Sequence, residues 1–247
     1  MCFNQIIETI HGSIDAKDNT MRFQNISWMD VEHYLQHDDR IMLVTGSTEQ
    51  HAYLSLLTDV LIPEKIAEAV ALREGVLVGP SLNFGVSHYF AEYPGTISLS
   101  QMTYDAVLFE MVQSLLQHGF RRFLFLNGHG GNRMPSALHD MEIEGTIRVA
   151  WYEWWRGSAM QTFESQHNLR FEHANWGENF PFTRVGDVPE GEKPTVNLDH
   201  DGAPILRDVL GDGSVGGRYQ IDDRSMMQLF DALVAEVSAV LRGLPPL

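Results

Sequence analysis

Three short polar segments of this chain hold the residue types that bind metal ions and move protons. Residues 46–51 read Gly-Ser-Thr-Glu-Gln-His, residues 127–132 read Asn-Gly-His-Gly-Gly-Asn, and residues 173–178 read His-Ala-Asn-Trp-Gly-Glu. Carboxylates and imidazoles are good ligands for zinc, manganese and iron(II). These segments are therefore candidates for a metal centre, and each of them also has a plainer explanation.

The first segment offers Glu49 and His51, with Asp59 eight residues beyond His51. Because Glu49 and His51 are two apart, an extended loop would point both side chains the same way. Asp59 would have to return to them through a loop. The plainer alternative is that Glu49 and Asp59 cap helices and His51 is a surface residue, and both interpretations stay open for this segment alone.

The second segment surrounds His129 with three glycines, which let the backbone turn sharply and approach another group closely. The alternative is a glycine loop that cradles a phosphate. No Lys-Ser or Lys-Thr pair follows as a P-loop requires, and the spacing does not match the dinucleotide fingerprint. The histidine therefore favours a metal over an anion. In the third segment, His173 and Glu178 could supply one acid/base group and one ligand, or be a chance pair in a polar loop.

The elements that would position these segments alternate between short apolar, β-rich runs and amphipathic stretches. This pattern is typical of a parallel sheet covered by helices, an α/β fold. We expect strands at residues 41–45, 76–78, 122–126 and 147–152. The first two polar segments directly follow the first and third of these strands, at the carboxyl ends where open α/β sheets bind ligands.

Helices are expected between the strands. Ser27 with Asp30 forms a capping box, and Pro63 suits the first turn of a helix that Gly75 closes. Further helices are expected at 103–118, from about Asn132 onward, and at 222–241. Residues 166–220 are rich in Gly, Pro and Asp and are expected to form loops. No linker divides the chain, so residues 1–247 are expected to form one domain.

Composition limits the class of protein. Seventeen basic against 33 acidic residues give a formal net charge of −16, which argues against nucleic acid as a partner because phosphate binding needs a basic surface. The single cysteine, Cys2, fits a reducing compartment. Residues 1–10 do not read as a signal peptide, and no apolar run approaches the ~20 residues of a membrane helix. A cytoplasmic protein with no membrane partner is therefore expected.

Together, the segments resemble the creatininase (creatinine amidohydrolase) family. Besides residues 46–51 and 127–132, the pair Thr58-Asp59 and the run Tyr-Pro-Gly-Thr-Ile-Ser-Leu at 93–99 are similar to family motifs, and the His-Ala…Glu segment follows at 173–178. All of them lie in family order within residues 41–180, which is more specific than any single motif.

This resemblance implies a metal-dependent hydrolase with a compact three-layer α/β/α sandwich and a mainly parallel central sheet, often assembled into hexamers. It also implies that one or two divalent ions (Zn, Mn or Fe) are bound by Glu49, His51, Asp59, His129 and Glu178, with Asp59 bridging two ions. His173 would be the acid/base group, and Glu178 would be the carboxylate that accompanies it in catalysis.

The chain departs from the family pattern at several positions. Many members continue the first motif as His-Gly-Pro-His-Leu, whereas residues 51–55 are His-Ala-Tyr-Leu-Ser. Trp176 replaces the first acid of the third motif, and Gly131 stands where creatininase itself has an acidic metal ligand. These changes indicate a divergent member with a substrate other than creatinine. The candidates for the wall of a substrate pocket are Leu54, Tyr93, Trp154 and Trp176, with core packing as the alternative for the tryptophans.

We therefore expect an enzyme that uses metal-activated water to hydrolyse a carbon–nitrogen amide bond, cyclic in the favoured case, of a small molecule. The alternatives are a deformylase-like or peptidase-like member of the same family, and a non-catalytic protein in which the metal holds an oligomer together. A homo-oligomer is expected because the helix at 222–241 carries more apolar residues than one narrow stripe needs, and because residues 151–155 are rich in aromatic side chains. The alternative is that the wider apolar stripe packs into the parent domain, and the hexamer is what the family resemblance implies.

Overall fold

The structure is a computed structural model that describes residues 21–198 and 207–247. Its centre is a sheet of four parallel strands in the order β2-β1-β3-β4, accompanied by an antiparallel hairpin of β5 and β6. The strands are β1 (Arg40–Thr45), β2 (Leu77–Val78), β3 (Arg122–Asn127), β4 (Arg148–Glu153), β5 (Glu192–Lys193) and β6 (Gly217–Arg218). Thr45 pairs with Asn127, and these are the last residues of β1 and β3. The polar segments that follow the two strands therefore leave the sheet side by side.

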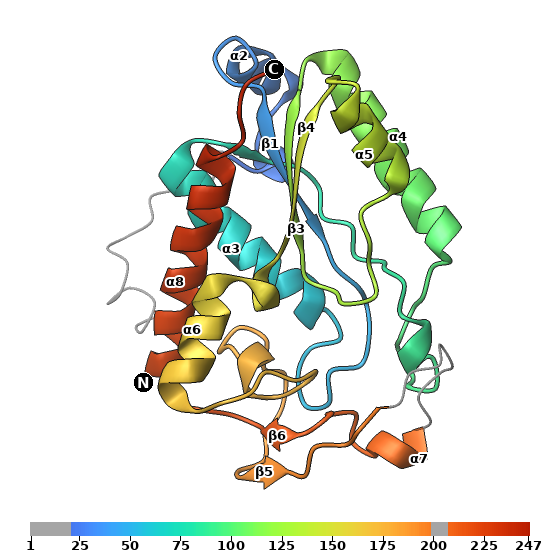
Figure 1. The fold of residues 1–247 in the computed structure, drawn as a ribbon, viewed down its shortest axis with the longest axis vertical. Coiled ribbons are helices and arrows are strands. Elements are labelled where there is room, and N and C mark those ends of the chain that lie inside the picture. The colour runs from blue at the N-terminus through green and yellow to red at the C-terminus, as the bar shows by residue number, and fades with distance from the viewer. Residues whose placement is uncertain (1–20, 199–206) are drawn as a thin grey trace.

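Helices cover both faces of the sheet, which Figure 1 shows nearly edge-on. One face packs on α2 (Trp28–Tyr34), α4 (Gln101–His118) and α5 (Ser136–Ile143), and the other on α3 (Thr58–Glu74), α6 (Ser158–His167) and α8 (Asp223–Arg242). Successive side chains of β3 point to opposite faces, so Phe123 and Phe125 join one core while Leu124 and Leu126 join the other. A strand buried on both faces has to be apolar throughout. The expected α/β/α sandwich with a parallel central sheet is confirmed.

Most helix ends follow the signals in the sequence. The capping box of α2 forms, with the backbone N–H of Ser27 donating to Oδ2 of Asp30 at 2.7 Å. Gly75 ends α3 with φ 64°, and Gly119 ends α4 with φ 113°. Both angles lie in the left-handed region that glycine enters without a steric penalty.

The start of α3 differs from the prediction. The helix begins at Thr58, so Pro63 lies inside it rather than in its first turn. A proline inside a helix cannot donate to the carbonyl four residues back, which here belongs to Asp59. The backbone at Gly128 lies against that carbonyl, because a Cβ added to Gly128 would be 1.9 Å from the Asp59 oxygen. The earlier start brings Asp59 into the first helical turn. The helix expected from Asn132 also starts later, at Ser136.

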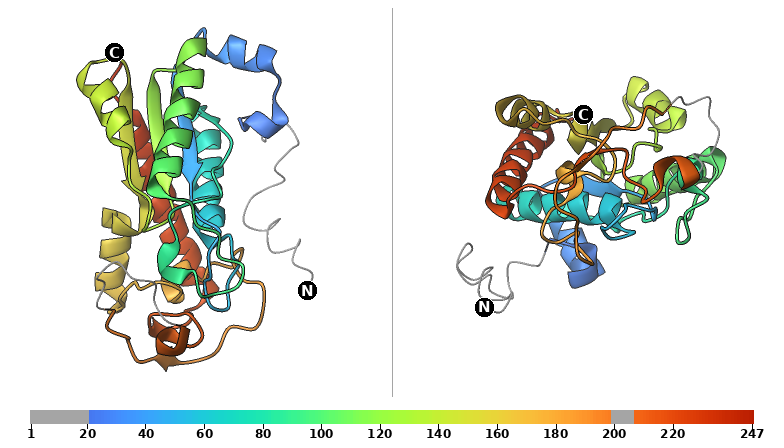
Figure 2. Two further views of the ribbon diagram at one scale, coloured as in Figure 1. Left: turned by 90° about the vertical axis from the view of Figure 1, so that its right-hand side faces the viewer. Right: turned by 90° about the horizontal axis from the view of Figure 1, so that it is seen from below.

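The predicted loop region holds little regular structure in its described part. It contains the β5–β6 hairpin, the short helix α7 (Arg207–Leu210) and a 3-10 helix at Trp176–Glu178. Figures 1 and 2 show that these elements gather beyond the carboxyl ends of the sheet strands. Further 3-10 helices span Phe23–Asn25, His88–Phe90 and Trp154–Arg156.

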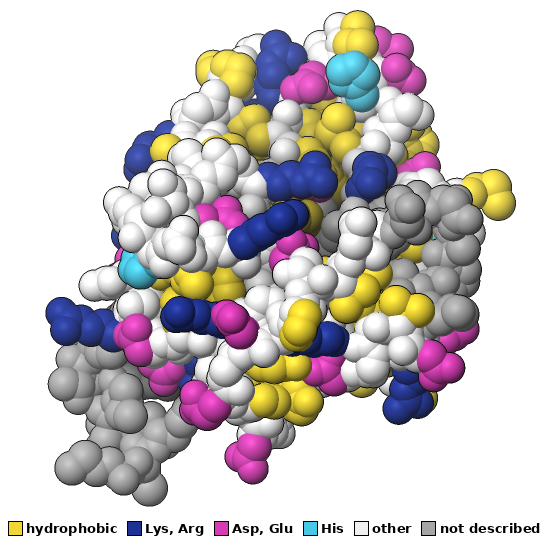
Figure 3. Space-filling view, turned by 60° about the horizontal axis from the view of Figure 1, so that its bottom comes forward, with side chains coloured by type: hydrophobic (Ala, Val, Ile, Leu, Met, Phe, Trp, Pro, Cys, Tyr) yellow, Lys and Arg dark blue, Asp and Glu magenta, His cyan; other side chains and the backbone are white. Residues whose placement is uncertain are grey.

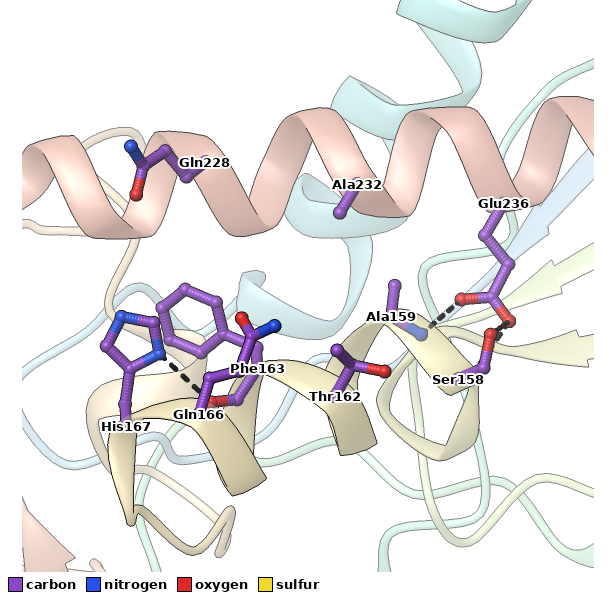
Figure 4. A pocket seen from close by; sticks show the side chains of 9 residues that line it. All are labelled: Ser158, Ala159, Thr162, Phe163, Gln166, His167, Gln228, Ala232 and Glu236. Atoms are coloured by element: carbon purple, nitrogen blue, oxygen red, sulfur yellow. Dashed lines mark hydrogen bonds between the residues drawn. The ribbon is translucent and has the colours of Figure 1, made fainter.

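The apolar residues of α8 pack within the chain. Leu229, Leu233 and Val237 are buried in the same core as residues of α3 and α6. A groove of about 330 Å³ remains between α6 and α8, where Glu236 accepts hydrogen bonds from the backbone N–H groups of Ser158 and Ala159 (Figure 4). Much of the face that suggested an oligomer is thus covered by the chain itself. The homo-oligomer stays a prediction.

Cys2 and residues 1–10, on which part of the compartment expectation depends, lie outside the described residues. Within residues 21–198 and 207–247, no helix combines the length and apolarity needed to cross a membrane.

Candidate metal centre

Four segments deliver the candidate ligands to one edge of the sheet. Glu49 and His51 follow β1, His129 follows β3, Asp59 lies in the first turn of α3, and Glu178 ends the 3-10 helix after His173. The structure thus brings together all five residues expected to be ligands, with His173 beside them. Their ligand atoms form three sets within which every pair of atoms is at most 4.8 Å apart: Glu49/Asp59/His129, His51/Asp59/Glu178 and Glu49/His51/His173.

Asp59 belongs to two of these sets and uses a different oxygen for each. Its Oδ1 lies 3.1 Å from Nε2 of His51, and its Oδ2 lies 2.9 Å from Nδ1 of His129. Glu178 lies on the first side, with Oε1 3.7 Å from Nε2 of His51. Glu49 lies on the second side, with Oε1 3.5 Å from Nδ1 of His129. A carboxylate in this position can bridge two cations.

Backbone hydrogen bonds fix which nitrogen each histidine offers. Nδ1 of His51 lies 3.2 Å from the carbonyl oxygen of Glu49, and Nε2 of His129 lies 3.0 Å from that of Val86. A carbonyl oxygen only accepts, so both of these nitrogens carry the proton. In the neutral rings, the opposite nitrogens then present lone pairs toward the carboxylates. Partners of this kind fix the tautomer and ring orientation of metal-binding histidines.

Lone pairs of nitrogen and oxygen therefore face one another in a buried space. Among the described residues, Oε2 of Glu49, Nε2 of His51 and Oδ2 of Asp59 are buried and make no well-aligned hydrogen bond. Facing lone pairs at about 3 Å repel unless a cation, either a proton or a metal ion, lies between them. The donor set of nitrogen and carboxylate oxygen suits zinc, manganese or iron(II). The residues present thus fit a divalent metal.

The same arrangement shifts the pKa values of the metal-free protein. Burial alone would lower the pKa of His51, but the charges of Asp59 and Glu178 outweigh it and raise that pKa well above 6.5. The pKa of His129 is likewise raised well above 6.5, because Glu49 and Asp59 outweigh burial. The pKa of Asp59 is lowered although burial opposes this, because both histidines stabilise its anion. In the metal-free protein, protons on His51 and His129 therefore balance the negative charges of the neighbouring carboxylates.

The glycine loop after β3 is held against the cluster by two asparagines at the ends of the Asn-Gly-His-Gly-Gly-Asn segment, Asn127 and Asn132. Oδ1 of Asn127 accepts from the backbone N–H of His129 at 3.2 Å and from Nδ2 of Asn132 at 3.1 Å. Asn132 in turn donates to the carbonyl oxygen of Gly46 and accepts from the backbone N–H of Val86. This network joins the ends of β1 and β3 and fixes the backbone of His129.

His173 lies at the open side of the cluster. Its Nδ1 is 3.7 Å from Oε1 of Glu49, and its ring stacks on that of Phe90 with centroids 4.3 Å apart. The side chain of His173 is 18% exposed, whereas that of His51 is fully buried. The pKa of His173 is lowered by burial and by the neighbouring charge of His51. Among the histidines of the cluster, it is the one a substrate can reach most easily.

Ala174 orients the carboxylate of Glu178. Its backbone N–H donates to Oε2 of Glu178 at 2.6 Å, which leaves Oε1 toward His51. Ala174 has φ 56°, a left-handed conformation that costs a non-glycine residue on the order of 1–3 kcal/mol. Backbone strain of this kind is concentrated at functional sites, so its position beside His173 supports a role for this segment.

A sequence model of the family described as creatininase, creatinine amidohydrolase, matches residues 24–241. The chain belongs to the creatininase family. It is 33% identical over 116 residues to creatinine amidohydrolase of Pseudomonas putida, covering 44% of this chain and 45% of that protein. It is 33% identical over 117 residues to a mycofactocin precursor peptide peptidase of Mycobacterium ulcerans, covering 42% and 46%. The chain thus matches less than half the length of either relative.

The fold agrees with this assignment. A crystal structure of creatinine amidohydrolase (creatininase) aligns with a TM-score of 0.77 at 22% identity, over 92% of this chain and 99% of that chain. One departure from the creatininase pattern has a structural reason. A Cβ at Gly131 would lie 2.0 Å from the carbonyl oxygen of Val86 and 2.6 Å from Nε2 of His129. The loop therefore has no room at this position for a further acidic ligand.

The four pocket-wall candidates have different surroundings. Tyr93 packs with Phe90, the residue that stacks on His173. Leu54 is buried, and its backbone pairs with that of Arg184 in an isolated antiparallel β-bridge. Trp154 and Trp176 are each 1% exposed and belong to the hydrophobic core with α3 and α8. The tryptophans thus pack the core, as their alternative interpretation states. Figure 3, in which the loop end of the molecule comes forward, shows acidic, basic and apolar side chains interspersed on this face.

Proposed function

We propose that this member of the creatininase family is a metal-dependent amidohydrolase that opens a carbon–nitrogen amide bond, cyclic in the favoured case, of a small molecule. The observation that carries the proposal is the carboxylate of Asp59, whose oxygens face two separate sets of nitrogen and oxygen ligands. Two cations held about one carboxylate are a recurring arrangement in hydrolases, where the pair binds both the attacking and the leaving groups.

The residues of the chain divide into two ligand sets. Glu49 and His129 would hold one ion, His51 and Glu178 the other, and Asp59 both. When bound, zinc, manganese or iron(II) polarises a substrate carbonyl and lowers the pKa of a coordinated water to about 7. The five residues are nearly or fully buried, so the chain limits access to the cluster and strengthens its electrostatic interactions.

His173 supports amide chemistry in particular. An amide nitrogen is a poor leaving group and needs a proton or a hydrogen bond as the carbon–nitrogen bond breaks. Nδ1 of His173 lies 3.7 Å from Oε1 of Glu49 at the edge of the cluster, and the side chain of His173 is 18% exposed. His173 would therefore serve the departing nitrogen, while Glu178, oriented by Ala174, completes the catalytic pair.

The second candidate function is cleavage of a peptide. The mycofactocin precursor peptide peptidase is as identical to this chain as creatinine amidohydrolase is, at 33% over 117 and 116 residues respectively. The two functions differ in the space they need above His173, because a peptidase must admit an extended chain. The deformylase-like alternative would instead hydrolyse formamides, so the substrate panel includes them.

A substrate panel tests the proposal. Metal-free protein reconstituted with zinc, manganese or iron(II) is incubated with cyclic amides, imides, ureas, formamides and short peptides, and products are identified by mass spectrometry. We expect metal-dependent addition of water to one of the small amides. Cleavage of peptides alone would favour the second candidate. Turnover that is equally fast in the metal-free protein would refute a metal-dependent hydrolase.

A further inference from the structure

Gln50, between the candidate ligands Glu49 and His51, does not face the metal cluster with a ligand atom of its own. Its side-chain oxygen accepts from the backbone N–H of Ala52 at 3.0 Å, and its nitrogen donates to the carbonyl oxygen of Gly213 at 2.9 Å. The same nitrogen lies 2.8 Å from Nε2 of His173. Gln50 therefore connects the first polar segment, the loop before β6 and His173.

The two backbone partners determine which way the amide of Gln50 points. A backbone N–H can only donate and a carbonyl oxygen can only accept, so exchanging the amide oxygen and nitrogen would lose both bonds. The second N–H of the amide then points at Nε2 of His173, which has to be an acceptor. Neutral imidazole has one donor and one acceptor nitrogen. The proton of neutral His173 is therefore on Nδ1, the nitrogen that faces Glu49.

We propose that Gln50 is the positioning residue of His173: it holds Nε2 as an acceptor, so that His173 presents its Nδ1–H to the substrate as a hydrogen-bond donor. This inference rests on the proposed function for its consequence in catalysis, but the hydrogen bonds that carry it are independent of the substrate. The imidazole ring of His173 also stacks on the ring of Phe90, which restricts the orientation of the imidazole plane. The hydrogen bond from Gln50 then determines where Nε2 lies within that plane.

The loop that supplies the Gly213 carbonyl is itself held in place. Nζ of Lys193 donates to Oδ1 of Asp212 at 2.6 Å and to the carbonyl oxygens of Leu210 and Ser214 at 2.5 and 2.6 Å. The other carboxylate oxygen of Asp212 accepts from the hydroxyl of Tyr219 at 2.7 Å. This partly buried ammonium with three acceptors fixes the backbone on both sides of Gly213.

Position 213 accepts only glycine in this arrangement. Its φ is 98°, and a Cβ would lie 1.8 Å from Oε1 of Gln50. A methyl group there has to displace the amide of Gln50. Gly191 offers a matched control, because its φ is 89° and nothing lies within 4 Å of an added Cβ. Both alanine variants carry left-handed backbone strain, and only Gly213→Ala pushes on Gln50.

The first experiment determines the protonated nitrogen of His173 directly. Zinc-loaded full-length protein with ¹⁵N-labelled histidine rings is studied by NMR, and the His173 signals are assigned by their loss in His173→Gln. We expect a pyrrole-type Nδ1 and a pyridine-type Nε2. In Gln50→Glu the new carboxylate only accepts, so Nε2 should become protonated. A protonated Nε2 in the wild-type protein, or unchanged signals in Gln50→Glu, would overturn the inference.

The second experiment uses the glycine pair, and covers the case in which Gln50→Glu does not fold. Relative to Gly191→Ala, Gly213→Ala should lose kcat by about 10–100-fold, the usual effect of losing an orienting partner, with KM and bound zinc unchanged. Its His173 signals should also shift. Equal behaviour of the two variants would overturn the inference. If the NMR result holds and no amide is hydrolysed, the positioning stands and the proposed function fails.

Discussion

Oδ2 of Asp59 lies 2.9 Å from Nδ1 of His129, whose Nε2 is bonded to the carbonyl oxygen of Val86. In the neutral ring, Nδ1 therefore has a lone pair that faces this oxygen, and a cation, either a proton or a metal ion, has to lie between the two atoms. Because the other oxygen of Asp59 faces His51 in the same way, one substitution should disturb both contacts.

Asp59→Asn tests this shared role. The amide keeps the shape but offers one neutral oxygen instead of two anionic ones, so bound metal should fall from stoichiometric to trace amounts, and turnover should be lost. Elemental analysis of the purified proteins measures the metal. Asp231→Asn, on the exposed side of α8, is the control and should keep its metal. Full metal content in Asp59→Asn would refute the assignment of Asp59 as a ligand.

His173→Ala separates metal binding from chemistry. If His173 serves the leaving group and is not a ligand, the variant should retain its metal and lose kcat by about 10²–10⁴-fold, the usual scale for a general acid. Metal content and steady-state kinetics are measured on the same preparation. Loss of the metal in this variant would instead make His173 a ligand of the set that it forms with Glu49 and His51.

Gly131→Ala and Gly130→Ala are neighbours with opposite expected outcomes. The methyl group at 131 would lie 2.0 Å from the Val86 carbonyl and 2.6 Å from Nε2 of His129, whereas the one at 130 meets nothing within 4 Å. Overpacking typically costs about 1–3 kcal/mol, so Gly131→Ala should lower the free energy of unfolding by this amount and weaken metal binding. Gly130→Ala should stay within about 0.5 kcal/mol of the wild type. Equal stability and metal content in both variants would mean that the loop is not packed as described.

Metal binding should release protons and strengthen as the pH rises. In the metal-free protein the pKa values of His51 and His129 are raised well above 6.5, so both rings are protonated near neutral pH and a metal ion must displace these protons. Calorimetric titration with zinc in buffers of different ionisation enthalpy measures the number released. A binding enthalpy that does not depend on the buffer would contradict the raised pKa values.

The same shifts give the metal-free protein a stability that depends on pH with a definite sign. A histidine whose folded-state pKa is raised stabilises the fold fully below its unfolded pKa of about 6.5, and this contribution is lost as the pH rises through the folded pKa. The free energy of unfolding of the metal-free protein should therefore decrease above about pH 6.5. His129→Gln should flatten this decrease, and an unchanged slope in that variant would contradict it.

The homo-oligomer is tested by light scattering at micromolar concentration. The expectation is a mass that is a multiple of 28.0 kDa, most plausibly of a hexamer. Since α8 packs against the chain's own α3 and α6, support for an oligomer now rests on family resemblance. A monomer with full hydrolase activity would remove the assembly prediction and leave the metal centre unaffected.

Local patterns predicted much of this molecule. The apolar run at residues 122–126 predicted strand β3, and the order of the polar motifs indicated which side chains meet. The start of α3 was not predictable, because the proline signal at Pro63 competes with a tertiary contact between Gly128 and the Asp59 carbonyl. The contact between Gln50 and His173 was not predictable either, because the two residues are 123 positions apart along the chain.

The central claim, an open metal centre about Asp59, is tested most directly by a crystal structure of the protein loaded with zinc or manganese, with the ions located by anomalous scattering. The account predicts ions on both sides of the Asp59 carboxylate, bound by Glu49 and His129 and by His51 and Glu178, with at least one coordination position free of protein atoms. A metal fully enclosed by protein ligands, or ions bound elsewhere while this cluster stays empty, would contradict it.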